Sequence, residues 1–451
     1  MILSMKTILG GSVFLLSFAA IAACNDDPMT TPAGSDAGTT IDSGTTPDTC
    51  ATTGSGTVTV TATGLPAGAA ASITFTDASG AHAITDGASI TAGTYAVTAN
   101  AVTTADPRIR TAYLGTVTTS SVCVKDGAAT TISVAYAIVP TSNKLWTTNA
   151  NGTSPLLAFA SSTLVDATSP APAVSAGLDL PNGIAFDRSG GLWTPSSVDG
   201  AVKLTHFAAT SLADSGTKTP DIALTSAALN AGVPAAASLA FDPSGNLWVS
   251  TPAVNKVVRF DAAQLEATGN AEPTASITMQ GPGALAFDAS GNLWAAELGM
   301  NRVVEYTAAH LGAAAPDVIL TAKSTTDGDL AGPRGLAFAA SGDLWVSYEG
   351  VLARFTAAER AATATVKPAV QIGVNVAALP ETIAFDESGG LWFAYTAGTL
   401  ARLSASQLVT STATGTDASP EIVLSSAAIG SAGEVAIFPA PGNLPLFSRL
   451  P

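Results

Sequence analysis

Seven side chains in the second part of the chain carry groups that could hold a ligand, and all stand at fixed offsets from a repeated Leu-Trp pair. They are Asn149, Asn182, Glu297, Arg334, Tyr348, Glu381 and Tyr395. Glu297 and Glu381, with the amide oxygen of Asn182, are hard oxygen donors of the kind that Ca²⁺ or Mg²⁺ takes. Arg334 would hold an anionic group, and the two tyrosines would offer apolar faces that end in a hydroxyl.

The elements that must position these side chains are internal repeats. Every Trp follows a Leu, and the pairs recur 46 to 55 residues apart, with the tryptophans at Trp146, Trp193, Trp248, Trp294, Trp345 and Trp392. Five copies have a matching strand and a Ser-Gly turn before the pair, as in LAFDPSGNLW at 239–248. A third strand such as 257–260 follows each hairpin, and a weaker fourth such as 276–279 comes after it. Four strands in about 50 residues form the blade of a β-propeller.

Repeat geometry places the candidate residues on one face. The first strand of a blade lines the central channel and the second runs back, so the residue before the first and the residue after the second share the channel mouth. The position two residues before the first strand of a blade holds Asn182, Ala237, Gly283, Arg334 and Glu381. The position three residues after each Trp holds Asn149, Ser196, Thr251, Glu297, Tyr348 and Tyr395. Variable residues on a constant framework are typical of a functional face. The alternative is that they are ordinary loop-end residues bonded to local backbone.

An aspartate stands just before the Ser-Gly turn in four copies, at Asp187, Asp242, Asp288 and Asp386. We expect these carboxylates to accept hydrogen bonds from the turn amides as Asx turns, rather than to bind metal.

The two ends of the repeat region complement each other. The first unit begins at 144–146 without its own first strand, and the last, 433–447, carries a degenerate copy of that strand. One blade built from both ends would close the ring without a free edge, which gives six blades. Seven blades are the alternative, because Asn443-Leu444 could start a further hairpin.

Residues 51–140 predict a separate β-sandwich of about seven short strands, with alternating segments such as 57–61 and 131–136 between Gly turns. Cys50 and Cys123 bracket this domain, and in an oxidising compartment they are expected to form a disulfide. Two free thiols are the alternative.

The N-terminal residues resemble a targeting signal. Lys6 and an apolar run from Ile8 to Ala23 make residues 1–23 a signal peptide, too short to span a bilayer stably. The ending Ile-Ala-Ala-Cys resembles a bacterial lipobox, which implies that Cys24 is acylated and anchors the chain in a membrane. Ordinary cleavage after Ala23 is the alternative. Residues 24–50 are acidic and poor in large apolar side chains, hence a disordered tether. By resemblance to other lipoproteins, in which Asp at this position favours retention in the inner membrane, Asn25 implies the outer membrane.

The region 141–451 resembles NHL-repeat propellers and their gluconolactonase-like and virginiamycin B lyase-like relatives. Pro181-Asn182-Gly183 is similar to a gluconolactonase motif, which implies a divalent metal held by Glu and Asn side chains, although neighbouring repeats hold Ala237 and Gly283 instead. The lyases need a His at the channel mouth. Here His206 is expected at a solvated outer position of the third strand, so lyase chemistry is disfavoured.

Composition limits the function further. The net charge is −16, which disfavours nucleic acid as a partner, and three Cys and three His leave little for a Cys/His metal site. The first hypothesis is an envelope lipoprotein whose propeller binds or scaffolds an envelope protein, a glycan or a small ligand. The alternatives are a lactonase-like or lyase-like enzyme that depends on a divalent metal, and a structural spacer. No cofactor is required; Ca²⁺ or Mg²⁺ is the ion that the donors would suit.

Overall fold

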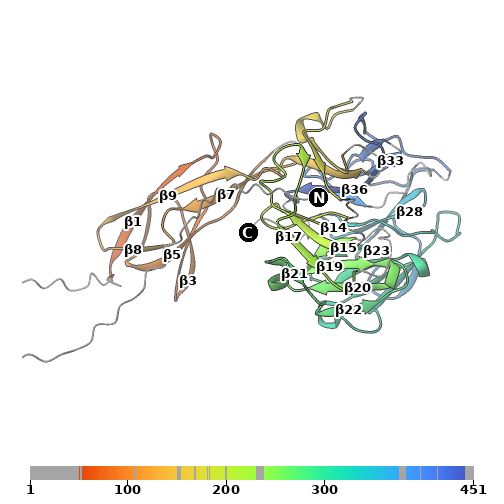
Figure 1. Ribbon diagram of the computed structural model, residues 1–451, viewed down its shortest axis with the longest axis horizontal. Coiled ribbons are helices and arrows are strands. Elements are labelled where there is room, and N and C mark those ends of the chain that lie inside the picture. The colour runs from red at the N-terminus through yellow and green to blue at the C-terminus, as the bar shows by residue number, and fades with distance from the viewer. Residues whose placement is uncertain are drawn as a thin grey trace, which may run out of the picture. The chain divides into compact units, whose positions relative to one another are not determined.

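The computed structural model describes Cys50 and residues 53–441, and the chain is all-β (Figure 1). Not described within this range are 106–107, 150–153, 167–168, 180, 182, 199–200, 230–237, 375–381, 397 and 414. The signal peptide, Cys24 and the tether up to Thr49 lie outside the described residues and stay predictions. No helix in the described part is long and apolar enough to cross a membrane.

The first domain is a β-sandwich, as predicted. One sheet has the order β4-β1-β9-β7-β6 and the other β3-β2-β5-β8. The strands are β1 Ser55–Thr63, β2 Ile73–Asp77, β3 Gly80–Ile84, β4 Ala88–Thr91, β5 Gly93–Ala99, β6 Val102–Thr104, β7 Thr111–Val117, β8 Ser121–Val124 and β9 Ala129–Ile138. Side chains alternate between solvent and core along β1 and β9, and the core contains Val58, Phe75 and Ile132.

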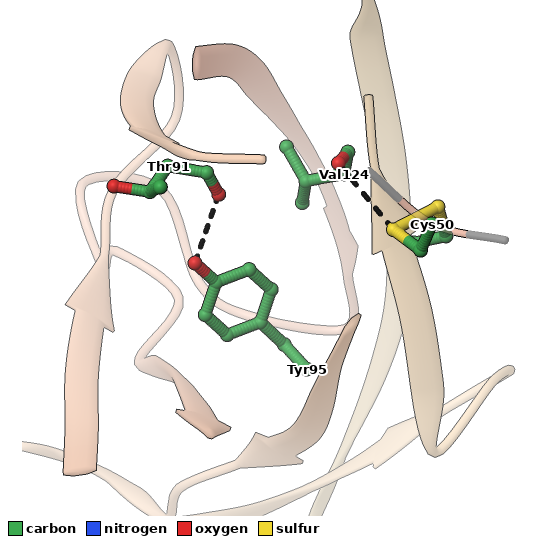
Figure 2. Close-up of a disulfide and its surroundings, with 5 residues drawn as sticks. Cys50, Thr91, Tyr95 and Val124 are labelled. Atoms are coloured by element: carbon green, nitrogen blue, oxygen red, sulfur yellow. Dashed lines mark hydrogen bonds between the residues drawn. A yellow bond between two sulfur atoms is a disulfide. The ribbon is translucent and has the colours of Figure 1, made fainter. Parts of the chain in front are cut away.

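The predicted disulfide is present (Figure 2). It joins Cys50, which precedes β1 of one sheet, to Cys123 on β8 of the other, with 5.6 Å between the Cα atoms. Close by, the Tyr95 hydroxyl donates a hydrogen bond to the Thr91 carbonyl oxygen at 2.8 Å, so β5 is fixed to the end of β4. The bridge therefore ties the two layers of the sandwich together.

The second domain is a β-propeller, to which the described residues contribute six sheets. The first two sheets contain β10 Lys144–Asn149, β11 Leu156–Ala160, β12 Val174–Gly177, β16 Gly216–Thr217 and β36 Ala432–Phe438; and β13 Ala185–Phe186, β14 Leu192–Val198, β15 Ala201–Phe207, β17 Ile222–Thr225 and β21 Gly269–Asn270. The next two contain β18 Leu239–Phe241, β19 Leu247–Thr251, β20 Lys256–Phe260 and β22 Ala275–Thr278; and β23 Pro282–Phe287, β24 Leu293–Glu297, β25 Arg302–Tyr306, β26 Val318–Ala322 and β30 Ala364–Val366. The last two contain β27 Leu336–Phe338, β28 Leu344–Tyr348, β29 Val351–Phe355 and β31 Val370–Gly373; and β32 Ile383–Phe385, β33 Leu391–Thr396, β34 Thr399–Leu403 and β35 Ile422–Ser425.

Short 3₁₀ turns, η1 Ser161–Thr163, η2 Pro252–Val254, η3 Ala262–Leu265, η4 Leu298–Met300 and η5 Ala308–His310, connect some of these strands. The strand β36 pairs with β10, so one sheet is built from both ends of the repeat region, as expected. Asn443-Leu444, where a further hairpin could begin, lies outside the described residues.

The Asp before each Ser-Gly turn holds that turn, as predicted. In one hairpin Asp242 Oδ1 accepts hydrogen bonds from the backbone amides of Ser244 and Asn246, at 2.9 and 3.0 Å. Its Oδ2 accepts one from the indole nitrogen of Trp248 at 3.1 Å. Asp288 and Asp386 make the same set of contacts with their own turns and tryptophans. The repeated Asp and Trp therefore hold the hairpin from within in these three blades.

Candidate functional site

The channel of the propeller is a cavity of about 170 Å³ between the innermost strands β13, β18, β23, β27, β32 and β36, lined mostly by apolar side chains. Each of these strands places an alanine opposite the Trp of the next strand: Ala185, Ala240, Ala286, Ala337, Ala384 and Ala436. These small side chains line the cavity with larger Ile, Leu, Val and Phe side chains. Its polar lining comes from Ser238, Thr382 and Glu434.

Hydrogen bonds between neighbouring blades fix this wall. The Leu285 amide donates to the Ser238 hydroxyl at 3.1 Å, and the Ala284 amide donates to the Arg334 carbonyl at 3.2 Å. The Val435 amide donates to the Thr382 hydroxyl at 2.6 Å. Hydrogen bonds therefore link neighbouring blades around the channel at three junctions.

The two sets of mouth positions expected from the repeat lie at the same end of the hairpins. Pro282 pairs with Glu297, and Asn149 pairs with Ala432. The Arg334 amide donates to the Ser347 carbonyl at 2.9 Å, next to Tyr348. The Ser-Gly turns lie at the other end of each hairpin, because the strands are antiparallel. Asn182, Ala237 and Glu381 lie outside the described residues, so their part in this mouth stays a prediction.

Two of the candidate side chains at this end hold loops of the protein itself. Asn149, 1% exposed, donates to the carbonyls of Ser154 and Ala428, and its oxygen accepts from the amides of Gly430 and Ser431. This is the loop-end role that the sequence left as the alternative.

Glu297, 4% exposed, is bonded in the same way on both oxygens. One accepts from the Gln280 amide at 2.8 Å and the other from the Arg302 guanidinium at 2.5 Å. A metal ion at Glu297 would have to displace Arg302. Among the described residues, no group of three or more His, Cys, Asp and Glu side chains is placed to hold a metal ion.

The remaining described candidates differ in exposure. Tyr348 is buried in a core cluster between two blades, and burial raises the pKa of its phenol. Tyr395 is half-buried, with its ring 6.1 Å from that of Phe393, and Arg334 is half-buried. Arg334 and Tyr395 therefore present surface near the mouth. Glu434 is a channel-lining carboxylate that sequence reasoning missed, because it falls in the degenerate last repeat.

The expectation that His206 is solvated was wrong. Its side chain is buried, with its ring centre 4.9 Å from that of Trp193, because the two residues are direct partners in the β14–β15 ladder. Nε2 lies 3.0 Å from Asp187 Oδ2, and Nδ1 lies 2.8 Å from Asp221 Oδ1. Glu305 and Arg402 at the same repeat position are also buried, whereas Arg259 and Arg354 are half-buried.

The two carboxylates set the charge of this histidine. Burial alone would lower the pKa of His206, but the hydrogen bond and charge of Asp187 and the charge of Asp221 outweigh it, so the pKa is raised. Burial would raise the pKa of Asp187, yet the hydrogen bonds from His206 and Ser189 outweigh this, and that pKa is lowered. The cluster is therefore an ion pair at mildly acidic pH.

Comparisons with known proteins give a fold likeness only. No family model matches the chain, and no curated protein matches it. A streptogramin B lyase structure is 16% identical, with 50% of this chain and 66% of that chain covered and a TM-score of 0.34. A virginiamycin B lyase from Staphylococcus aureus is 14% identical, with coverage of 50% and 82% and a TM-score of 0.31. The Swd1 β-propeller domain from Myceliophteria thermophila is 13% identical, with coverage of 50% and 65% and a TM-score of 0.35. The chain thus spans just under two thirds of the first and third of these structures, and the neighbours are consistent with a propeller.

Proposed function

We propose that this protein is a lipid-anchored envelope protein whose propeller is a binding module, with its binding surface at the channel mouth near Arg334 and Tyr395. Asn182 and Glu381 complete that surface by their repeat positions. The lipid on Cys24 holds the chain on the outer membrane, and the acidic tether separates the folded domains from it. The partner is an envelope protein or a glycan.

The proposal rests on two features of the mouth: Asn149 and Glu297 are bonded to other parts of the protein, and the channel behind them is lined mostly by apolar side chains. Asn149 and Glu297 bind protein groups with the polar atoms that would otherwise reach a ligand, so they shape the mouth without acting on a substrate. Behind the mouth, a wall rich in alanine suits a small apolar group of a ligand. Arg334 would hold an anionic group of the same ligand, and Tyr395 would stack on a sugar or an apolar side chain.

A matched pair of bulky substitutions tests the site. Ala337 lines the channel, whereas Ala340 is exposed in the Ser-Gly turn at the other end of the same hairpin. In cells that produce the protein, chemical cross-linking followed by mass spectrometry should identify a partner with the wild type and with Ala340→Trp. Ala337→Trp should lose it at a temperature where melting curves show that both variants are folded, although the bulky side chain lowers its melting temperature by packing against the core cluster of Trp345. Equal cross-linking of both variants would place the binding surface elsewhere.

The anchor is tested separately. Cys24→Ser should release the protein from the membrane fraction or leave it unprocessed, and detergent-phase partitioning measures this. Unchanged partitioning of the variant would rule out the lipid anchor without touching the binding proposal.

A further inference from the structure

Two junctions between neighbouring blades, on the side of the Ser-Gly turns, are built from the same repeat positions. The Arg360 junction contains Asp288, Trp294, Phe338 and Gly342, together with Arg360 itself. The Leu265 junction contains Asp187, Trp193, Phe241 and Gly245, together with Leu265. In each, the Asp and Trp come from one blade and the Phe and Gly from the next, and the fifth residue follows the third strand of that next blade by five positions.

Arg360 fills the first junction with its guanidinium. The carbon of that group lies 5.3 Å from the centre of the Trp294 ring and 5.1 Å from that of Phe338. One nitrogen donates to the Gly342 carbonyl oxygen at 2.7 Å, and another lies 3.9 Å from Asp288 Oδ2. The chain therefore shows which group this arrangement accepts: a planar cation over two aromatic faces, with a carbonyl and a carboxylate at its edge.

The second junction has the same walls without the cation. Leu265 replaces the arginine, and a pocket of about 360 Å³ opens beside Trp193, Phe241 and Gly245. The junctions also differ in packing. Phe338 is 6% exposed and makes an edge contact with Trp294, at 6.4 Å between ring centres, whereas Phe241 is half-buried. The aromatic side chain that Arg360 covers in one junction is thus partly open in the other.

Charged groups of both signs line the pocket. His206 takes the place that Glu305 has in the first junction, and it contacts two carboxylates, those of Asp187 and Asp221. Of these two carboxylates, Asp187 lines the pocket and Asp221 does not. At the rim stand exposed Glu266 and Arg188, whose guanidinium is directed to the Pro243 carbonyl at 3.3 Å. The charged groups that line the pocket are therefore two carboxylates, Asp187 and Glu266, with Arg188 and His206 beside them.

We propose that the Leu265 junction is a binding pocket for the guanidinium of an arginine side chain, presented by a peptide or protein ligand. The guanidinium would lie against the half-buried Phe241, beside the buried Trp193, and donate to the Gly245 carbonyl, as Arg360 does to Gly342. This pocket is separate from the channel mouth, since it lies on the turn side of the hairpins. It would let the propeller take a second contact from a basic segment.

The test uses N-acetyl-L-arginine amide as the probe and ligand-observed NMR with the purified full-length chain in detergent. The matched neutral probe is N-acetyl-L-citrulline amide, which has nearly the same shape without the charge. The wild type should bind the arginine probe at least tenfold more tightly than the citrulline probe. Leu265→Arg should abolish this binding because the chain then fills its own pocket, and Leu265→Met, of similar length but neutral, should retain it.

A second variant covers the case in which Leu265→Arg does not fold. Glu266 is exposed, so Glu266→Lys should fold normally and weaken binding of the arginine probe by reversing a rim charge. The proposal is overturned if the wild type does not bind the arginine probe, if it binds both probes equally, or if folded Leu265→Arg binds as the wild type does. Loss of binding in the channel variant Ala337→Trp would also overturn it, because it would locate the probe at the mouth.

Discussion

Ala436 pairs with Trp146 in the antiparallel ladder between β36 and β10, although the two residues are 290 positions apart in the sequence. The pairing runs from Lys144 with Phe438 to Asn149 with Ala432, and the Glu434 amide also donates to the Thr148 hydroxyl at 2.9 Å. The last described strand is therefore the innermost strand of the first repeat sheet. It covers an edge that would otherwise be open to other chains.

Removal of residues 432–451 should abolish cooperative unfolding of the propeller. The loss exposes the edge of β10 and takes Val435 and Phe438 out of two core clusters. Calorimetry should show a broadened transition at lower temperature, and proteolysis should be faster. A synthetic peptide of residues 430–441 should restore the transition in part, and a scrambled peptide should not. A truncated chain that melts like the full one would contradict this role of β36.

The double variant Cys50→Ser/Cys123→Ser should destabilise the sandwich. The bridge closes a loop with a sequence separation of 73 residues. In the chain-entropy model, a loop of this size contributes about 4 kcal/mol to the free energy of unfolding. Urea unfolding followed by hydrogen exchange of the sandwich strands measures the difference, and the wild type with reductant should behave like the variant. A loss below about 1 kcal/mol would show that the sheets alone hold the domain.

The sequence predicted those features that depend on residues close together in the chain. The Leu-Trp pairs, the Ser-Gly turns and the Asx role of Asp242 all follow from contacts within six residues. Burial of His206 was not predicted, because it depends on Asp221 in the next strand and on the stacking against Trp193 across the ladder. The contacts of Arg360 were not predicted either, because its partners Asp288 and Trp294 belong to the neighbouring blade. The residues that all repeats share predict the strands of a blade. The contacts that differ between blades depend on residues that differ from one repeat to the next.

The stability that His206 contributes should depend on pH. Its folded pKa is raised, so its contribution is complete below the ordinary value of about 6.5 and is lost as the pH rises through the raised pKa. The pKa of Asp187 is lowered, so its contribution is present above about pH 4 and is lost as the pH falls through the lowered value. His206→Gln should therefore cost most near pH 5.5, about 1–3 kcal/mol, and less near pH 8.5.

Urea unfolding of wild type and variant at several pH values measures this difference. His310→Gln is the matched control, because His310 also pairs with an aspartate, Asp317, but its side chain is 60% exposed. An exposed pair contributes less than about 1 kcal/mol, so the control should change little at any pH. A cost of His206→Gln that stays constant from pH 5.5 to pH 8.5 would show that packing on Trp193, and not the ion pair, is what matters.

Arg334→Ala should weaken binding of the envelope partner by a factor of ten or more, because a charge-assisted hydrogen bond to a ligand contributes about 1.5–3 kcal/mol. Glu381→Ala should act in the same direction, by the repeat position that the two residues share. Asp242→Ala is the control from the other end of the hairpins. It removes the acceptor for Ser244, Asn246 and Trp248, so it should lower the melting temperature and leave the affinity of the folded protein unchanged. Titration of the purified partner against each variant, at a temperature where all are folded, separates the two effects. If Asp242→Ala alone abolished binding, the binding face would be the side of the Ser-Gly turns, and the channel mouth would have only a structural role.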